Sequence, residues 1–174
     1  LLSVLLPRPQ LARKLSFEMT DWVDSNNLVD AVDGAEDAEY RYRRTPNLPV
    51  AHESEFRALR SVTLEGLPRE GVLFDYLTAL PVDTPLNLNT ASSAVLDAVL
   101  GQYGGNAAAA VEQLRQEGPI TDVSALFGVA PFNELDSDQR QAVRRRVAVS
   151  SSYFQVMIDV ELDGRRTRLV TRIY

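Results

Sequence analysis

The sequence predicts an α+β fold in which an N-terminal helix and a C-terminal antiparallel β-hairpin flank a large all-helical insertion. Apolar residues recur at helical spacing from about residue 9 to residue 23. From His52 to about Ser150 the pattern is that of short helices separated by turns. The period then changes to two, with apolar residues alternating from Tyr153 to Leu162. Helical patterns followed by a separate strand pattern are typical of the α+β class.

The first helix is predicted to begin at Pro7 or Pro9 and to end near Val23. Its apolar stripe, with spacings of three and four residues, consists of Leu11, Leu15, Met19 and Trp22. One face of this helix is therefore suited to pack against other elements.

The predicted hairpin lies at the other end of the chain. Asp163-Gly164 is a strong two-residue turn signal between the strand 153–162 and a returning strand over 166–174. An isolated hairpin is only marginally stable in water. We therefore expect it to pack on the N-terminal helix.

The middle of the chain is predicted to be a helical insertion. Helices are expected over 53–60, over 68–77 with Pro68 in the first turn, after residue 90 or 92 with a buried stripe over 95–100, and over 107–116, 121–127 and 136–146. Thr90 or Ser92 is placed to cap the third of these helices. On this basis residues 1–50 and 147–174 form a discontinuous α+β part, and residues 51–146 form an inserted helical domain.

The composition limits the functions open to this chain. Its net charge of -6 disfavours nucleic-acid binding, because phosphate contacts need a basic face. The chain has no cysteine, so disulfides, thiolate zinc sites and cysteine nucleophiles are excluded. His52 is the only histidine and no Gly-x-Ser-x-Gly segment is present, which excludes two-histidine zinc ligation and a nucleophile elbow. We therefore expect no catalytic residues and no enzyme activity.

The most distinctive segment is acidic and runs from Asp21 to Tyr40 without a lysine or arginine. Its acidic residues are Asp21, Asp24, Asp30, Asp33, Glu36, Asp37 and Glu39. Carboxylates this close together repel one another, so the segment is either a solvated loop or a cation site. Calcium is the natural candidate cation, because it takes six to eight oxygen ligands from carboxylates, amides and backbone carbonyls. A full EF-hand pattern is absent.

A different interpretation comes from residues 86–92, Leu-Asn-Leu-Asn-Thr-Ala-Ser, which resemble the entry to helix-hairpin-helix modules of DNA-binding proteins. Those modules need a tight hairpin whose backbone amides meet a phosphate, with lysine or arginine nearby. The corresponding region here, 101–106, is followed by no basic residue before Arg115. A helix cap with a packing role is favoured, and a nucleic-acid-binding module is the alternative.

Several short segments form a pattern when they are taken together and in order. They are Asp21-Trp-Val-Asp24, Gly34-Ala-Glu-Asp37 followed by Tyr40, Ser54-Glu-Phe-Arg57, Ala79-Leu-Pro81, Leu86-Asn-Leu-Asn-Thr-Ala91 and Tyr153-Phe-Gln-Val156. With this pattern the chain resembles the K-type minor pseudopilins of the bacterial type II secretion system, the general secretion pathway protein K family. The resemblance implies a pilin-like α+β domain with a large helical insertion.

The resemblance also implies a location and partners. Members of this family lie at the tip of the pseudopilus, bind the I-type and J-type minor pseudopilins, and initiate assembly for protein export. Secreted substrate proteins are further candidate partners. The family is anchored in the inner membrane by an N-terminal helix, after prepilin peptidase removes a leader, and its soluble part lies in the periplasm. We expect that helix and the start of the pilin fold upstream of Leu1.

Family members also bind calcium, and the acidic segment is the natural site for it. The expected ligands are Asp21, Asp24, Asn26, Asp33, Glu36 and Asp37, with backbone carbonyls completing the shell. Asp24 and Asn26 place two oxygens one residue apart, although the family pattern favours an acidic residue at Asn26. Gly34 permits a turn that brings Glu36 and Asp37 back. The expected role is structural, because a cation would remove the repulsion and fix a loop with few apolar anchors.

Overall fold

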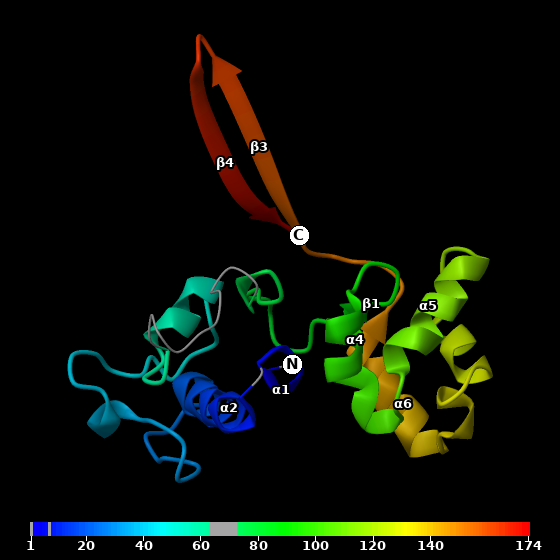
Figure 1. Cartoon of the computed structure of the whole chain (residues 1–174), viewed down its shortest axis with the longest axis horizontal. Helices are drawn as coiled ribbons and strands as arrows, with labels where there is room; N and C mark the ends of the chain where they lie inside the picture. The colour runs from blue at the N-terminus through cyan, green and yellow to red at the C-terminus, as the bar shows by residue number, and fades with distance from the viewer. Residues whose placement is uncertain (1, 7, 63–72) are drawn as a thin grey trace.

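The structure, a computed structural model, consists of two helix-rich lobes and a projecting β-hairpin (Figure 1). It describes residues 2–6, 8–62 and 73–174. The N-terminal lobe, the described residues up to 77, contains α1 (Leu2–Leu5), α2 (Pro9–Val23) and the 3-10 helices η1 (Asp37–Glu39) and η2 (Glu53–Ala58). Among the described helices, none combines the length and the apolarity that crossing a bilayer requires.

The helical lobe spans residues 86–149, and the hairpin follows it. Its elements are β1 (Leu86–Asn87), α4 (Ser93–Leu100), η3 (Gly101–Tyr103), α5 (Ala107–Glu117), η4 (Val123–Gly128), η5 (Phe132–Glu134), α6 (Ser137–Arg146) and β2 (Val147–Ala148). The hairpin consists of β3 (Phe154–Leu162) and β4 (Arg165–Ile173). The mixture of helices and an antiparallel pair of strands confirms the predicted α+β class.

An apolar core holds the helical lobe together. Its helices turn fully buried side chains inward, among them Leu96, Leu100, Val111, Leu126 and Phe132. The short strands β1 and β2 pair in parallel and close the lobe where the chain enters and leaves it. Each large aliphatic or aromatic side chain buried in this core contributes about 1.5–3 kcal/mol to the stability of the fold.

Most predicted helices of this lobe are confirmed within a residue or two. The helix predicted over 107–116 is α5, and the helix predicted over 136–146 is α6 with Asp136 as its cap. The segment predicted as a helix over 121–127 is instead the 3-10 helix η4, and Asp122 caps it by accepting a hydrogen bond from Ser124 N at 2.5 Å. 3-10 geometry is frequent in short connecting segments such as this one.

The N-terminal lobe is built around α2. The buried side of α2 presents Leu15 and Trp22 to Phe56, Leu59 and Leu73, which come from later in the chain. The helix predicted over 53–60 is the 3-10 helix η2, another short connecting segment. The start of the helix predicted over 68–77 lies outside the described residues.

A buried carboxylate also ties the later segment to α2. Glu18, in the middle of α2, is fully buried and accepts hydrogen bonds from Ser61 N at 2.9 Å and from Ser61 Oγ at 2.6 Å. Arg60 Nε lies 3.6 Å from Glu18 Oε1, the oxygen that also accepts from Ser61 Oγ. The predicted boundary at residue 51 stays a prediction, and the buried residues of 56–59 group with α2 rather than with the helical lobe.

The hairpin extends away from both lobes (Figure 1). The predicted turn at Asp163-Gly164 is confirmed, and both residues have positive φ. The predicted packing on the N-terminal helix is wrong for this structure, because α2 buries its apolar side against Phe56 and Leu59 instead. Nearly all residues of β3 and β4 are exposed.

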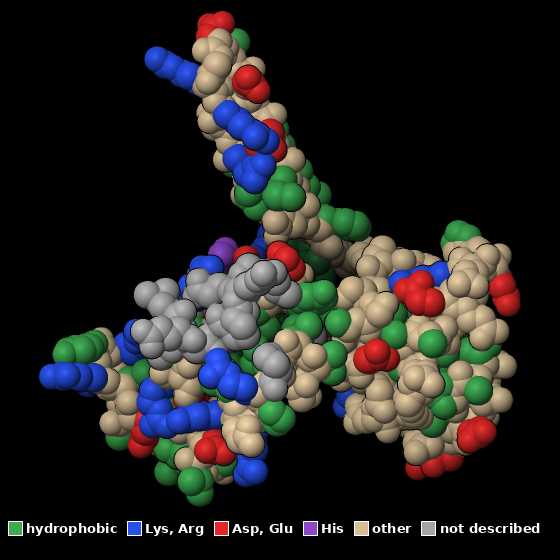
Figure 2. All heavy atoms as spheres, viewed as in Figure 1, with side chains coloured by type: hydrophobic (Ala, Val, Ile, Leu, Met, Phe, Trp, Pro, Cys, Tyr) green, Lys and Arg blue, Asp and Glu red, His purple; other side chains and the backbone are tan. Residues whose placement is uncertain are grey.

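The two faces of the hairpin differ in character. Cross-strand partners share a face, so the register places Phe154 with Ile173 and Ile158 with Leu169 on an apolar face. These four side chains are about half exposed. The opposite face is charged, and Arg168 Nε donates to Asp159 Oδ1 at 2.7 Å. Figure 2 shows charged side chains along the outer part of the hairpin and apolar ones toward its base.

Candidate metal centre

The acidic segment is organised by one buried carboxylate at the end of α2. Asp21 is fully buried, and its Oδ2 accepts a hydrogen bond from Ala35 N at 2.7 Å. Its Oδ1 accepts from Asp30 N at 3.2 Å. A Cβ atom on Gly34 would collide with Asp21 Oδ2, so the loop passes this closely only because residue 34 is glycine.

Three carboxylates converge at this point. One oxygen from each of Asp21, Asp24 and Asp30 lies within 4.8 Å of the other two. Asp24 follows the last turn of α2, and its Oδ1 accepts from Asn26 N at 3.0 Å. Its Oδ2 is buried and has no hydrogen-bond partner among the described residues. A buried anionic oxygen without a partner is costly unless a cation or a donor compensates it.

A second buried carboxylate lies on the other arm of the loop, outside the three whose oxygens converge. Glu36 is 2% exposed, and Thr45 Oγ1 donates a hydrogen bond to its Oε2 at 2.6 Å. Its Oε1 is buried and, within the described part of the chain, unpartnered. Burial raises the pKa of Glu36, and the negative charges of Asp21, Asp24 and Asp37 raise it further, against the hydrogen bond from Thr45.

The remaining predicted ligands lie in different surroundings. Asp33 Oδ2 is 3.4 Å from Arg13 Nε, so its charge is balanced by α2. Asn26 Oδ1 accepts from Leu28 N at 2.8 Å and so closes a local turn. Asp37 Oδ1 accepts from Thr45 N at 2.9 Å, while its Oδ2 lies 3.8 Å from Arg44 Nε.

The donor set fits a hard divalent cation. Asp21, Asp24, Asp30 and Glu36 bring only carboxylate oxygens, and two of those oxygens are buried without a partner. Oxygen-only ligation is what calcium prefers, whereas zinc and other transition metals favour nitrogen or sulfur ligands. The arrangement can therefore hold a calcium ion and link the end of α2 to the loop that follows it.

Two residues of this centre were not predicted as site residues. No spacing pattern in the sequence linked Asp30 to Asp21 and Asp24. Thr45 comes eight residues after Asp37, beyond the acidic segment, and no local signal connects it to Glu36. Only the fold brings these residues together.

The segment that resembles a helix-hairpin-helix entry has a packing role. The Asn89 side chain donates to Ile120 O at 2.9 Å and to Val149 O at 2.8 Å, and it accepts from Ile120 N at 2.8 Å. Arg115, the first basic residue that follows the 101–106 region in the sequence, donates hydrogen bonds to Leu88 O and Ala91 O. These groups hold the helical lobe closed, so they are not available to a phosphate.

His52 has a local structural role. It precedes η2, and its Nδ1 accepts a hydrogen bond from Ser54 N at 3.1 Å. Its Nε2 lies 3.4 Å from Glu53 Oε1. This arrangement caps a short helix and presents no activated nucleophile.

Comparisons with known proteins agree with this fold. A family model described as type II secretion system (T2SS), protein K, matches residues 1–82. Type II secretion system protein K of Pseudomonas aeruginosa (strain PAO1) is 29% identical over 186 residues, covering 99% of this chain and 50% of the relative. The protein of the same name from Pectobacterium carotovorum subsp. carotovorum is 29% identical over 182 residues, covering 94% and 54%.

A solved structure has the same fold over nearly the whole chain. The crystal structure of the GspK-GspI-GspJ complex from the enterotoxigenic Escherichia coli type 2 secretion system contains a chain that matches with a TM-score of 0.77. The identity is 21%, and the match covers 99% of this chain and 62% of that one. The chain described here spans about half the length of the curated relatives it matches.

Proposed function

We propose that this chain is the periplasmic part of a minor pseudopilin at the tip of the pseudopilus, because the model of the type II secretion system protein K family matches residues 1–82. It acts by binding I-type and J-type minor pseudopilins and so initiates pseudopilus assembly for protein export. The observation that carries the proposal is the agreement of the family match with a fold match over 99% of the chain. The role is non-catalytic, which agrees with the structural use of His52.

The exposed apolar face of the hairpin supports a pilin-like arrangement. Phe154, Ile158, Leu169 and Ile173 lie on one face of β3 and β4 with no covering element among the described residues. A two-stranded sheet with an apolar face needs a helix or further strands to be stable. In our proposal this face receives the N-terminal helix of the pilin-like domain, a part of the protein outside residues 1–174, and that helix anchors the protein in the inner membrane.

The acidic segment is proposed to bind calcium in a structural role. Asp21, Asp24 and Asp30, whose oxygens converge, would hold the ion together with Glu36. Asp24 Oδ2 and Glu36 Oε1 are buried and have no hydrogen-bond partner among the described residues. The ion would supply positive charge where the carboxylates otherwise repel one another. The protein itself supplies the geometry through Gly34, which permits close approach, and through Thr45, which orients Glu36.

Co-purification tests the assembly role. The protein with its pilin-like helix would be expressed with tagged I-type and J-type pseudopilins and purified through the tag. We expect a complex of all three proteins, and a matched variant with Ile158→Asp on the hairpin should reduce its yield because a charge would disrupt the covered face. Failure of the wild-type protein to co-purify with either pseudopilin would contradict the proposed function.

The alternative function, nucleic-acid binding, makes an opposite prediction. A helix-hairpin-helix module would bind duplex DNA with an affinity that falls steeply as salt rises. We expect no such binding, because the chain is acidic and the Leu86–Ala91 region is used for packing. Tight and salt-sensitive binding in a fluorescence-anisotropy titration would favour the alternative.

A further inference from the structure

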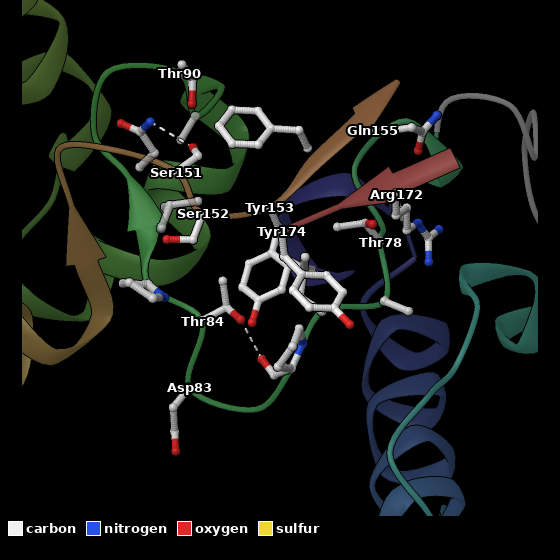
Figure 3. A pocket seen from close by; sticks show the side chains of 18 of the residues that line it. Thr78, Asp83, Thr84, Thr90, Ser151, Ser152, Tyr153, Gln155, Arg172 and Tyr174 are labelled. Carbon is white, nitrogen blue, oxygen red and sulfur yellow. Dashed lines mark hydrogen bonds between the residues drawn. The ribbon is translucent and has the colours of Figure 1, made fainter. Parts of the chain in front are cut away.

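A cleft of about 1080 Å³ lies where the two lobes and the base of the hairpin meet (Figure 3). Its walls come from parts of the chain that are far apart in sequence: 49–51, 78–91, 145–155 and the end of β4. Pockets for small molecules usually measure about 300–1,000 Å³. The cleft is therefore large enough for a short stretch of polypeptide.

The cleft is largely apolar. Pro49, Val50, Leu80 and Phe154 contribute to its lining. Tyr153 and Tyr174 lie side by side within it, with ring centroids 5.9 Å apart (Figure 3). Aromatic side chains of this kind bury a large area at a small cost in conformational entropy, so the cleft is suited to receive apolar side chains.

One wall offers unused backbone groups. The backbone of residues 150–152 continues from β2 along the cleft, and it makes no hydrogen bond with other described residues. The side chain of Ser151 is held by Asn87, whose Nδ2 donates to Ser151 Oγ at 2.9 Å. The chain bends at Ser150 and Ser152, so these groups do not form a regular strand edge, but they can exchange individual hydrogen bonds with a bound peptide.

The charges in the cleft have the sign opposite to that of the whole chain. The chain carries a net charge of -6, yet Arg145 and Arg146 line the cleft and are exposed. Arg145 has no hydrogen bond or ion pair with described residues, and Arg146 contacts only the ring of Tyr103, at 5.8 Å. Arg172 also lines the cleft, but it is paired with Glu53, which lies outside the lining. Asp83 contributes the one acidic side chain among the described residues of the lining.

We propose that this cleft binds an extended segment of a partner protein that combines apolar and acidic side chains. The apolar side chains lie against Tyr153, Tyr174 and Leu80, and the carboxylates pair with Arg145 and Arg146. Backbone groups of residues 150–152 exchange hydrogen bonds with the segment. This inference goes beyond the proposed assembly role, which does not require a peptide in the cleft.

Two labelled peptides test the proposal with the 174-residue chain. The first is a capped heptapeptide of alternating leucine and glutamate, and the second has glutamine in place of each glutamate. We expect saturable binding of the acidic peptide in fluorescence anisotropy. The dissociation constant of the neutral peptide should be at least about tenfold higher, because charge-assisted hydrogen bonds are stronger than neutral ones. Equal binding of the two peptides, or binding of neither below about 1 mM, would overturn the proposal.

A pair of variants locates the binding. R145E/R146E should weaken binding of the acidic peptide by about tenfold or more, since it replaces the two arginines of the cleft that are not paired with a carboxylate of the described residues by anions. R41E/R165E makes the same change in net charge at exposed arginines outside the cleft and should bind as the wild type does. Circular dichroism confirms that both variants fold. Retained binding in R145E/R146E, or equal loss in the two variants, contradicts the assignment to this cleft. Neither result depends on co-purification with pseudopilins.

Discussion

The two lobes of this molecule are held together in different ways. The helical lobe buries a cluster of large apolar side chains, including Leu96, Leu126 and Phe132, around three α-helices. The N-terminal lobe also has an apolar cluster, but its loop is organised by the buried carboxylates of Asp21 and Glu36. Apolar burial needs no partner of specific charge, whereas a buried carboxylate needs donors or a cation. We therefore expect the stability of the N-terminal lobe to depend on its ionic surroundings more than that of the helical lobe does.

The largest expected effect is in the helical lobe. Leu96→Ala removes a fully buried side chain and should lower the free energy of unfolding by about 2–5 kcal/mol. A thermal or denaturant melt measures this loss, which should be the same with calcium and with a chelator. A loss that calcium restores would contradict the separation of the two lobes.

Calcium should stabilise the protein through the N-terminal lobe. A ligand that binds only the folded state at a hundred times its dissociation constant adds about 2.7 kcal/mol. The melting temperature should therefore rise on adding calcium, and Glu36→Gln should largely remove the rise. Asp33→Asn is the matched control, because Asp33 pairs with Arg13 outside the carboxylate cluster, and it should keep the rise. An unchanged melting temperature at millimolar calcium would remove the ion from this account.

Gly34 should be the least tolerant position of the loop. Gly34→Ala places a methyl group onto Asp21 Oδ2, and the forced shift should cost about 1–3 kcal/mol of stability. The variant should also respond less to calcium, since Asp21 is displaced. Gly105→Ala, where an added Cβ meets nothing within 4 Å, is the control. Equal stability of the two variants would show that the close approach at Gly34 is unimportant.

The smallest expected effect concerns acid stability. Burial opposes the ionisation of Glu55, but hydrogen bonds from Trp22 Nε1 and from the backbone of Ala51 and His52 lower its pKa below the ordinary value of 4.5. A depressed pKa stabilises the fold above the unfolded value and loses that effect as pH falls through the folded value. Glu55→Gln should therefore cost about 1 kcal/mol at neutral pH and little in acid. A cost that is independent of pH below about pH 5 would contradict this assignment.

The sequence predicted the helical lobe better than the metal centre. The positions of α4, α5 and α6 follow from local patterns, because apolar spacing and the Asp136 cap act within a few residues. The hairpin turn was equally local. The convergence of Asp30 with Asp21, and the bond from Thr45 to Glu36, depend on how the chain folds back and leave no local signal. For the same reason, the hairpin's distance from α2 could not be predicted from its alternation.

Hydrogen–deuterium exchange with and without calcium tests the central comparison most directly. The account predicts that calcium increases protection of the amides between Asp21 and Thr45, including Ala35 N, which donates to Asp21. Amides of α4, α5 and α6 in the helical lobe should exchange at unchanged rates. Equal protection of both lobes, or no change at residues 21–45, would contradict the claim that a calcium ion holds the acidic loop of the N-terminal lobe.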